Sequence, residues 1–550
     1  MWLVFFVVLT GIYLAIATLE PSGFGVWQDD AVYVVTAKSL AQGTGYRHLE
    51  MPGQPLQTKY PPLFPVLLSV VWRISDHWPA NRFFMHAIIS GSLALVVLLA
   101  WRYFRKVLDV SPRQAIVLTV LTAASPLLIS MNRFLMSELP YTALTLAVLY
   151  MLDRRLIATQ NRKSEIVWSM AAGLLIVCAV MTRTHGLSLA AGGVLMLLWR
   201  RKWLAATWIT VIVAAAVLGY GAWQHLAATA NGSLQSTPLF SYGLDYGLWC
   251  TIAPTELVRV MWQNTCRTVM GAGVFLLAYP VDWLYPAFAR FGGATVGLQI
   301  WCWLVAGTMI TGFISSLHRK LTMHLYVLVY LLIMLAWPFD PYRFLIPLTP
   351  FALYFLYQGA LVLTRPLMRW PRLASTALVS AAALLMILSS VENAKILTST
   401  RESYYIWVGQ TKDLDQLDEV AEWIRCNTPA DAVLASQNTA DFYLSTGRQF
   451  VEAWVNDDPV NEEYGSDRLR WRFYAMGTSR EVPGVLDRMR QDLWKLYRQA
   501  GVDYCIWDSS TRVLAPIPRV AREQPDRFRR VFVSSRKTLA VFEVLPSPEL

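Results

Sequence analysis

The chain has 550 residues, and its composition is that of a membrane protein. Hydrophobic residues make up 55% of the sequence and charged residues only 15%, with a mean hydropathy of +0.39, whereas soluble domains contain about 25% charged residues. This composition excludes a disordered chain and a typical cytosolic enzyme. It favours one large membrane domain with a smaller domain attached to it.

The net charge of +11 is unevenly distributed along the chain. The first 391 residues carry 27 Lys and Arg against 13 Asp and Glu, and the remaining residues carry 21 against 24. Basic loops that set membrane topology explain this excess better than nucleic-acid binding, because no patch of interleaved basic and aromatic residues stands out. We therefore expect membrane lipids, and not nucleic acid, among the partners.

Apolar segments that approach the roughly 20 residues of a membrane-spanning helix recur up to residue 391. Eleven spans are predicted, at residues 2–18, 83–101, 115–130, 139–152, 166–181, 187–199, 203–223, 294–317, 321–337, 344–363 and 373–390. The first segment lacks the basic start and the small-residue cleavage site of a signal peptide, so we interpret it as a retained span.

Clusters of Lys, Arg and His orient the spans. The five clusters lie within residues 102–113, 154–163, 200–202, 318–320 and 365–372. If all five face the cytoplasm, the spans alternate consistently, with a cytoplasmic N-terminus and an extracytoplasmic tail. The apolar segment 266–281 would break this alternation as a twelfth span, so we interpret it as an in-plane or re-entrant helix. These features predict a multi-pass membrane protein, which we expect in a bacterial inner (plasma) membrane.

The sequence divides into a transmembrane domain, residues 1–391, and an extracytoplasmic tail, residues 392–550. The first exterior loop covers residues 19–82. In the tail, strands separated by helices predict an α/β domain. The expected helices are residues 414–426 and 486–500, and the expected strands are residues 432–435, 502–507, 531–534 and 539–544. No Gly-rich phosphate loop precedes either helix, so a nucleotide site is not predicted.

The six cysteines do not form a disulfide framework. Cys250 with Cys266, and Cys426 with Cys505, are pairs that an oxidising compartment would allow, and free thiols are the equal alternative. No CxxC or HxxxH spacing indicates a zinc site.

Two adjacent carboxylates, Asp29 and Asp30, precede a helix predicted at residues 31–41 in the first exterior loop. Acids at this position commonly cap a helix, since they accept hydrogen bonds from its free amides. Other polar groups are predicted on the same membrane face, however, and in that context we favour a functional role for this pair.

Lys59 precedes a segment with three prolines in five residues, Pro61, Pro62 and Pro65. Prolines at this density interrupt a spanning helix and shape the point at which the chain re-enters the membrane. Lys59 then lies at the membrane edge. It is either a lysine whose long side chain reaches the interface, or a cation that holds a lipid phosphate.

Most of the other predicted exterior turns also carry cations, although such turns are normally depleted of them. The charged and polar residues of these turns are Arg133, Ser137, Glu138, Arg183, His185, Asp340, Tyr342 and Arg343. Ion pairs between the turns are one explanation. A polyanionic ligand, such as a lipid-linked phosphate, is the other.

In chain order, Asp29-Asp30, the Lys-Tyr-Pro-Pro-Leu-Phe-Pro segment at 59–65, Ser137-Glu138 and the Tyr-Arg-Phe-Leu-Ile-Pro segment at 342–347 form a recognisable set. This set resembles the motifs of the integral-membrane glycosyltransferases of the C-type fold. The branch most similar in these motifs is family 39, with the protein O-mannosyltransferases and the lipid A aminoarabinose transferases. The resemblance extends over about residues 2–350.

The resemblance implies an α-helical polytopic fold and a polyprenyl-phosphate sugar donor used at the outer face of the membrane. It implies that Asp29 is the base that deprotonates the acceptor hydroxyl, with Asp30 at a position where many members have Glu. It also implies that Lys59 and Arg343 bind the donor phosphate. The extra domains of protein O-mannosyltransferases are absent, so the acceptor class, whether lipid, glycan or protein, stays open.

Further site residues are expected from their charge or polarity and from their positions in the predicted exterior segments. Tyr342, Arg133, Arg183 and His185 are predicted to help bind the donor phosphate, and Glu138 and Tyr60 to support the site.

The chemistry is consistent with this assignment. Inverting transfer from a phosphate-activated sugar needs one carboxylate as general base, while cations stabilise the charge that develops on the leaving phosphate. We therefore expect no metal ion and no other cofactor. Two other functions remain open: a transporter or flippase of lipid-linked glycans, and a non-catalytic envelope assembly protein.

Overall fold

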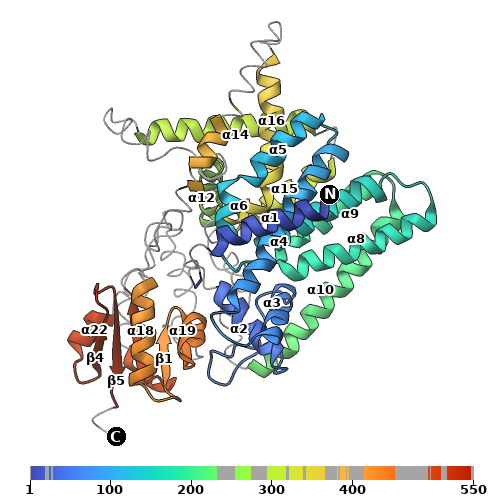
Figure 1. Cartoon of the computed structure of the whole chain (residues 1–550). Coiled ribbons are helices and arrows are strands. Elements are labelled where there is room, and N and C mark those ends of the chain that lie inside the picture. The colour runs from blue at the N-terminus through green and yellow to red at the C-terminus, as the bar shows by residue number, and fades with distance from the viewer. Residues whose placement is uncertain are drawn as a thin grey trace. The chain divides into compact units, whose positions relative to one another are not determined.

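The computed structural model of the chain forms two compact units (Figure 1). The first contains Met1–Leu19, His86–Gly221 and Val258–Thr398, and the second contains Glu20–Met85, Ala222–Leu257 and Ser399–Leu550. The structure describes residues 2–18, 24–25, 29–231, 254–273, 294–317, 321–337, 342–365, 381, 384–391, 393–394, 414–452, 493–495, 497–508 and 517–546.

The first unit is built from helices, of which α4, α10 and α12 begin or end in residues of the second unit. They are α1 (Trp2–Thr18), α4 (Arg82–Lys106), α5 (Pro112–Ala123), α6 (Pro126–Met131), α7 (Glu138–Met151), η1 (Leu152–Leu156), α8 (Arg162–Thr182), η2 (Thr184–Gly186), α9 (Leu187–Trp199), α10 (Trp203–Asn231), α12 (Pro254–Gly271), α14 (Ala294–Ser316), α15 (Leu321–Leu335), η5 (Tyr342–Leu348) and α16 (Thr349–Leu363).

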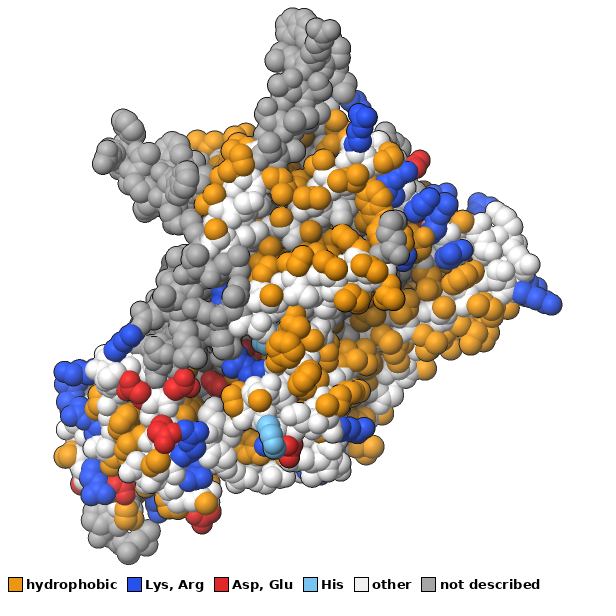
Figure 2. All heavy atoms as spheres, viewed as in Figure 1, with side chains coloured by type: hydrophobic (Ala, Val, Ile, Leu, Met, Phe, Trp, Pro, Cys, Tyr) orange, Lys and Arg blue, Asp and Glu red, His pale blue; other side chains and the backbone are white. Residues whose placement is uncertain are grey.

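Within the described residues, four helical segments are long and apolar enough to cross a membrane: Arg82–Lys106, Arg162–Thr182, Trp203–Asn231 and Arg343–Leu363. Shorter apolar helices accompany them, including α1 and α15. Figure 2 shows hydrophobic side chains gathered over the helices of this unit, as expected for surfaces that face lipid. The total of eleven spans stays a prediction, since most of residues 373–390 lie outside the described part of the chain.

The span predicted at residues 115–130 is wrong as a single helix. Helix α5 ends at Ala123, and a new helix, α6, begins at Pro126. Proline has no backbone N–H to donate and its ring clashes with the preceding turn, so it occupies the first position of a helix far more readily than the middle. Pro126 therefore divides an apolar segment that hydropathy alone reads as continuous.

The in-plane helix predicted at residues 266–281 is only partly described. Helix α12 begins earlier than expected, at Pro254, and ends at Gly271. Residues 274–293 lie outside the described residues, so the orientation of this segment stays a prediction.

The second unit combines helices with a five-stranded sheet. Its elements are α2 (Asp29–Ala41), α3 (Leu63–Ile74), α18 (Leu414–Asn427), β1 (Val433–Ser436), α19 (Thr439–Thr446), β2 (Gln449–Glu452), β3 (Tyr504–Asp508), α22 (Ile517–Glu523), β4 (Phe528–Val533) and β5 (Leu539–Val544). The bounds of strands β1, β3, β4 and β5 differ from the predicted bounds by at most three residues. Helix α19 and strand β2 were not predicted, because they are short and follow each other without a clear change of periodicity.

The strand order in the sheet is β2-β1-β3-β5-β4. Strand β1 pairs in parallel with β2 and β3, whereas β5 pairs antiparallel with β3 and β4. Parallel neighbours require crossover connections, and antiparallel neighbours allow a hairpin. The described tail therefore consists of a parallel half followed by the closing hairpin.

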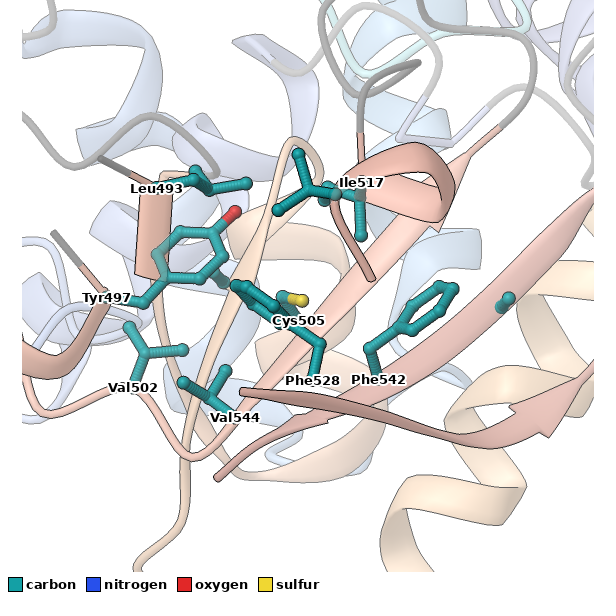
Figure 3. Packing of buried hydrophobic residues seen from close by; sticks show 11 residues of the cluster. Leu493, Tyr497, Val502, Cys505, Ile517, Phe528, Phe542 and Val544 are labelled. Carbon is teal, nitrogen blue, oxygen red and sulfur yellow. The ribbon is translucent and has the colours of Figure 1, made fainter. Parts of the chain in front are cut away.

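Side chains alternate between the two faces of the sheet, and both faces are covered. On one face, α18 packs against residues such as Leu434, Phe450 and Val541. On the other face, Tyr497 and α22 pack against Cys505 and Phe542 (Figure 3). Consecutive residues of β5 thus contribute to different cores, which explains why its first four residues, Leu539 to Phe542, are all apolar instead of alternating.

Of the two alternatives left open for Cys426 and Cys505, the structure has free thiols and not a disulfide. Both are free thiols: Cys426 is exposed at the end of α18, and Cys505 lies in the core beneath the sheet. Burial raises the pKa of the Cys505 thiol, which makes it unreactive at neutral pH. Cys266 is also a free thiol, and Cys250 lies outside the described residues.

The tail packs against the first exterior loop within the second unit. The Phe450 amide donates a hydrogen bond to the Glu50 carbonyl at 2.7 Å, and the ammonium of Lys38 in α2 lies 5.3 Å from the Tyr443 ring and 5.5 Å from the Trp72 ring. This loop, which the sequence assigns to the membrane domain, is therefore part of the same compact unit as the tail.

Gly25 lies close to Asp441 of α19. Its φ angle is +79°, and a Cβ atom added there would clash with the carboxylate of Asp441. Both the backbone conformation and the close approach therefore require glycine at this position.

We expect Gly25→Ala to destabilise the protein more than Gly43→Ala. Both glycines have positive φ angles, and strain of about 1–2 kcal/mol is expected for each, but a Cβ on Gly43 would meet nothing within 4 Å. Thermal unfolding of both variants in detergent, with and without Asp441→Ala, measures the difference. The Asp441 change should rescue only the Gly25 variant, and equal losses in both glycine variants would contradict the contact.

A second prediction concerns the two tail thiols. A variant that keeps Cys426 as its one cysteine should react with a membrane-impermeant maleimide in intact spheroplasts, because this thiol is exposed and the tail is predicted to be extracytoplasmic. A variant that keeps Cys505 alone should react only after unfolding. Labelling of Cys426 only after the membrane is permeabilised would overturn the predicted topology.

Candidate functional site

Helix α2 begins at Asp29, two residues earlier than predicted, so both carboxylates lie in its first turn. Most residues of α2 from Ala31 to Ser39 are buried. Helix α3 packs against it, and the indole of Trp72 donates a hydrogen bond to the Val34 carbonyl at 3.1 Å. The acid pair is therefore attached to a helix whose position is determined by packing around most of its surface.

The two acids have different environments. Asp30 is completely buried, and its two oxygens accept hydrogen bonds from the Ala31 amide at 2.8 Å and from the Gly25 amide at 2.9 Å. The Ala31 amide is a free donor of the first turn of α2, and the Gly25 amide lies before the helix. Asp30 thus satisfies backbone donors and places negative charge at the positive end of the helix, but it does so from inside the first turn and not from the N-cap position that the sequence suggested.

Asp29 is partly exposed, and its carboxylate interacts with a side chain from another part of the loop. The Tyr60 hydroxyl donates a hydrogen bond of 2.5 Å to Asp29 Oδ1. The Tyr60 ring is held by an edge contact with Tyr33, with 5.3 Å between ring centroids. A partly exposed carboxylate that is oriented by a neighbouring hydroxyl can act as a general base.

Lys59 lies next to this pair, in a segment with a defined backbone conformation. The Gln57 side-chain oxygen accepts hydrogen bonds from the amides of Lys59, at 2.7 Å, and Tyr60, at 3.4 Å. Only 7% of the Lys59 surface is exposed, and its ammonium lies 5.9 Å from the Tyr60 ring centroid. The structure therefore brings together Asp29, Asp30, Lys59 and Tyr60 within the second unit.

A separate set of predicted residues meets within the first unit, around the fully buried Glu138 at the start of α7. Arg183 Nη1 lies 2.7 Å from Glu138 Oε1, and Arg343 Nε lies 3.9 Å from the same oxygen. Arg183 also donates a 3.0 Å hydrogen bond to the Ser137 hydroxyl. Ion pairs between turns, one of the two explanations offered by the sequence, therefore do occur.

The two guanidinium groups of Arg183 and Arg343 share the carboxylate of Glu138, which holds them close to each other. Both guanidinium groups also lie over the Phe344 ring, at 5.4 Å and 5.3 Å from its centroid. Planar guanidinium groups held in this way can bind the oxygens of a phosphate.

His185 belongs to the same cluster through its ring. It stacks on Phe344 with 4.9 Å between centroids and lies 5.2 Å from the Tyr330 ring. Its carbonyl accepts hydrogen bonds from the Tyr141 and Ser188 hydroxyls. These contacts give His185 a packing role beside the two arginines.

The remaining two predicted residues are less defined. Arg133 is buried in the turn between α6 and α7, five residues before Glu138. Tyr342 is the first residue of η5, and its side chain lies outside the described part of the structure.

Sequence reasoning missed Tyr33, Gln57 and Phe344 as parts of these clusters. Gln57 lies two residues before Lys59, where a side chain can cap the next amides, and this was the one local signal that could have identified it. Tyr33 and Phe344 contribute through packing, which the sequence does not show.

No group of three or more His, Cys, Asp or Glu residues that could hold a metal ion occurs in the described residues. The expectation of a metal-independent reaction stays a prediction.

Comparison with known proteins gives matches in structure but not in sequence. No protein-family model matches the chain, and no curated protein matches it by sequence. The oligosaccharyltransferase of Archaeoglobus fulgidus, in a crystal structure with Zn and sulfate, is similar with a TM-score of 0.56 and 13% identity, over 97% of this chain and 72% of that one.

ArnT from Cupriavidus metallidurans, a lipid A aminoarabinose transferase solved with bound undecaprenyl phosphate, is similar over 99% of this chain and 98% of its own. The TM-score is 0.54 and the identity 12%. The archaeal oligosaccharyltransferase AglB, in complex with an inhibitory peptide and a dolichol-phosphate, has a TM-score of 0.50 over 99% of this chain and 74% of that one. The chain therefore has the fold of the C-type membrane glycosyltransferases.

Proposed function

We propose that the protein transfers a sugar from a polyprenyl-phosphate donor to an acceptor hydroxyl at the outer face of a bacterial inner membrane. The observation that carries the proposal is the hydrogen-bonded pair of Asp29 and Tyr60 next to the buried Lys59, in a chain with a C-type glycosyltransferase fold. Its structural neighbours were solved with undecaprenyl phosphate and with a dolichol-phosphate, which supports a lipid-linked donor.

In the proposed reaction, the acceptor hydroxyl attacks the anomeric carbon of the sugar while the bond from that carbon to the phosphate oxygen breaks. Asp29 takes the proton of the acceptor hydroxyl, and the polyprenyl phosphate leaves with one additional negative charge. Lys59 is proposed to stabilise this charge, and for Arg343 and Arg183, which belong to the other unit, the same role is proposed from the sequence alone. Because the leaving group is already a phosphate, no general acid is required, and the reaction is proposed to proceed without a metal ion.

Asp30 has a supporting role in this proposal, since backbone amides engage both of its oxygens. Glu138 is proposed to position Arg183 and Arg343. The sugar, whether a hexose or a pentose, and the acceptor class remain to be identified by experiment.

The proposal is tested with purified protein and the labelled donors undecaprenyl-phosphate mannose and undecaprenyl-phosphate aminoarabinose, presented with extracts of envelope lipids, glycans and proteins. Acceptor-dependent release of undecaprenyl phosphate is the expected result. A flippase or an assembly protein would release none, and no release with either donor would argue against this transferase.

Asp29→Asn is expected to lower the rate of sugar transfer by about 10²- to 10⁴-fold, the usual contribution of a general base. Asp30→Asn is the matched comparison: it keeps one oxygen for capping, so we expect about 1 kcal/mol of lost stability and a much smaller loss of rate. Transfer rates and thermal unfolding of both variants decide this. If both variants are equally stable and Asp30→Asn loses more transfer rate than Asp29→Asn, then Asp30 and not Asp29 is the general base.

Lys59→Ala and Arg343→Ala are each expected to weaken the affinity for undecaprenyl phosphate by about 10- to 100-fold, as each removes a charge-assisted contact of about 1.5–3 kcal/mol. Lys163→Ala is the control, because Lys163 is an exposed cation at the start of α8. Equilibrium binding to protein in nanodiscs measures the effect. Unchanged affinity in both site variants would exclude these cations as phosphate ligands.

A further inference from the structure

The last residues of α10 contact the chain directly before Lys59. The Asn231 side chain forms two hydrogen bonds with the backbone of Leu56: its oxygen accepts from the Leu56 amide, and its nitrogen donates to the Leu56 carbonyl, each at 2.8 Å. The Gln224 side-chain nitrogen donates to the Thr58 carbonyl at 2.5 Å. All of these residues belong to the second unit.

The spacing of the two carboxamides suits this contact. Gln224 and Asn231 are seven residues apart, which places them on the same face of a helix two turns apart. With 29 residues, α10 is about 43 Å long, whereas the hydrocarbon core of a bilayer is about 30 Å thick. The helix is therefore long enough to present its final turns outside the membrane, beside the loop between α2 and α3 (Figure 1).

The backbone around Lys59 is held from several directions. Gln57 accepts from the Lys59 and Tyr60 amides, the Tyr46 hydroxyl donates to the Tyr60 carbonyl at 3.1 Å, and Leu56 forms a β-bridge with Arg47. These contacts come from the same loop and would move with it. Asn231 and Gln224 differ because they belong to a helix that is not part of the loop.

We propose that Asn231 and Gln224 are positioning residues that hold residues 56–60 against α10 and so place the Lys59 ammonium and the Tyr60 hydroxyl. This inference rests on the proposed function, in which Lys59 binds the donor phosphate and Tyr60 orients Asp29. Neither carboxamide needs to touch the donor. Because small displacements of binding groups strongly reduce their effect, loosening this segment should weaken donor binding.

The contact between Asn231 and Leu56 links two segments that are far apart in the sequence. Leu56 and Asn231 are separated by 175 residues, so the geometry of the loop depends on where α10 ends. A carboxamide provides both a donor and an acceptor without titrating, so it can satisfy both polar groups of Leu56 over the whole physiological pH range. Aspartate at the same position would keep the acceptor and lose the donor.

The test compares Asn231→Ala, Asn231→Asp and Gln224→Ala with the control Thr229→Ala. Thr229 is exposed on the same turn of α10, and its hydroxyl bonds only to the His225 carbonyl of the same helix in the contacts described. Two quantities are measured in nanodiscs: hydrogen exchange of the amides of residues 56–60, and the affinity for undecaprenyl phosphate. Thermal unfolding confirms that each variant is folded.

We expect faster exchange at residues 56–60 and an affinity lower by on the order of tenfold for Asn231→Ala, with a smaller effect for Asn231→Asp and no change for Thr229→Ala. If Asn231→Ala and Gln224→Ala both bind undecaprenyl phosphate as tightly as Thr229→Ala while Lys59→Ala does not, the positioning role is overturned and the proposed function stands. If Lys59→Ala also binds normally, the donor-binding role of Lys59 itself is overturned, and the positioning role with it.

Discussion

A charged side chain that is buried in a protein must be stabilised by partners, and this constraint organises both sets of candidate site residues. Asp30 accepts hydrogen bonds from two backbone amides, and Glu138 pairs with two guanidinium groups. Lys59 lies in a segment whose backbone is hydrogen-bonded on several sides. An unpaired charge in such surroundings would cost several kcal/mol. The stability of these charged residues therefore depends on the hydrogen-bonding and ion-pairing groups that the surrounding structure places next to them.

This constraint also separates residues that look equivalent in the sequence. Asp29 and Asp30 are adjacent and chemically identical, yet one is engaged by the backbone and the other faces the Tyr60 hydroxyl. The difference follows from helical geometry, since consecutive residues of a helix point about 100° apart. One acid of the pair can therefore bond to backbone amides while its neighbour bonds to a side chain from another part of the loop.

Several elements could be predicted from sequence because their signals are local. Helices α1 and α9 have the predicted bounds, since each is an apolar segment with a polar or charged residue shortly after its end. Strand β5 also has its predicted bounds, and Pro546 lies shortly after its end. The break between α5 and α6 could not be read from hydropathy, although Pro126 was visible in the sequence. Helix α19 and strand β2 were missed because each is short, and because the surface that buries them belongs to other segments.

By itself, the sequence determined that the chain is a membrane protein, which residues are candidates for a site, and a resemblance whose fold the structural comparisons bear out. Hydropathy and motif order suffice for this because both are properties of neighbouring residues. The tertiary structure alone decided which acid bonds to backbone amides at the start of α2 and that Glu138 gathers Arg183 and Arg343. It also decided that the tail packs on the first loop and that the end of α10 contacts the segment before Lys59. Those outcomes depend on hydrogen bonds and close approaches between residues far apart in the chain, which no local pattern encodes.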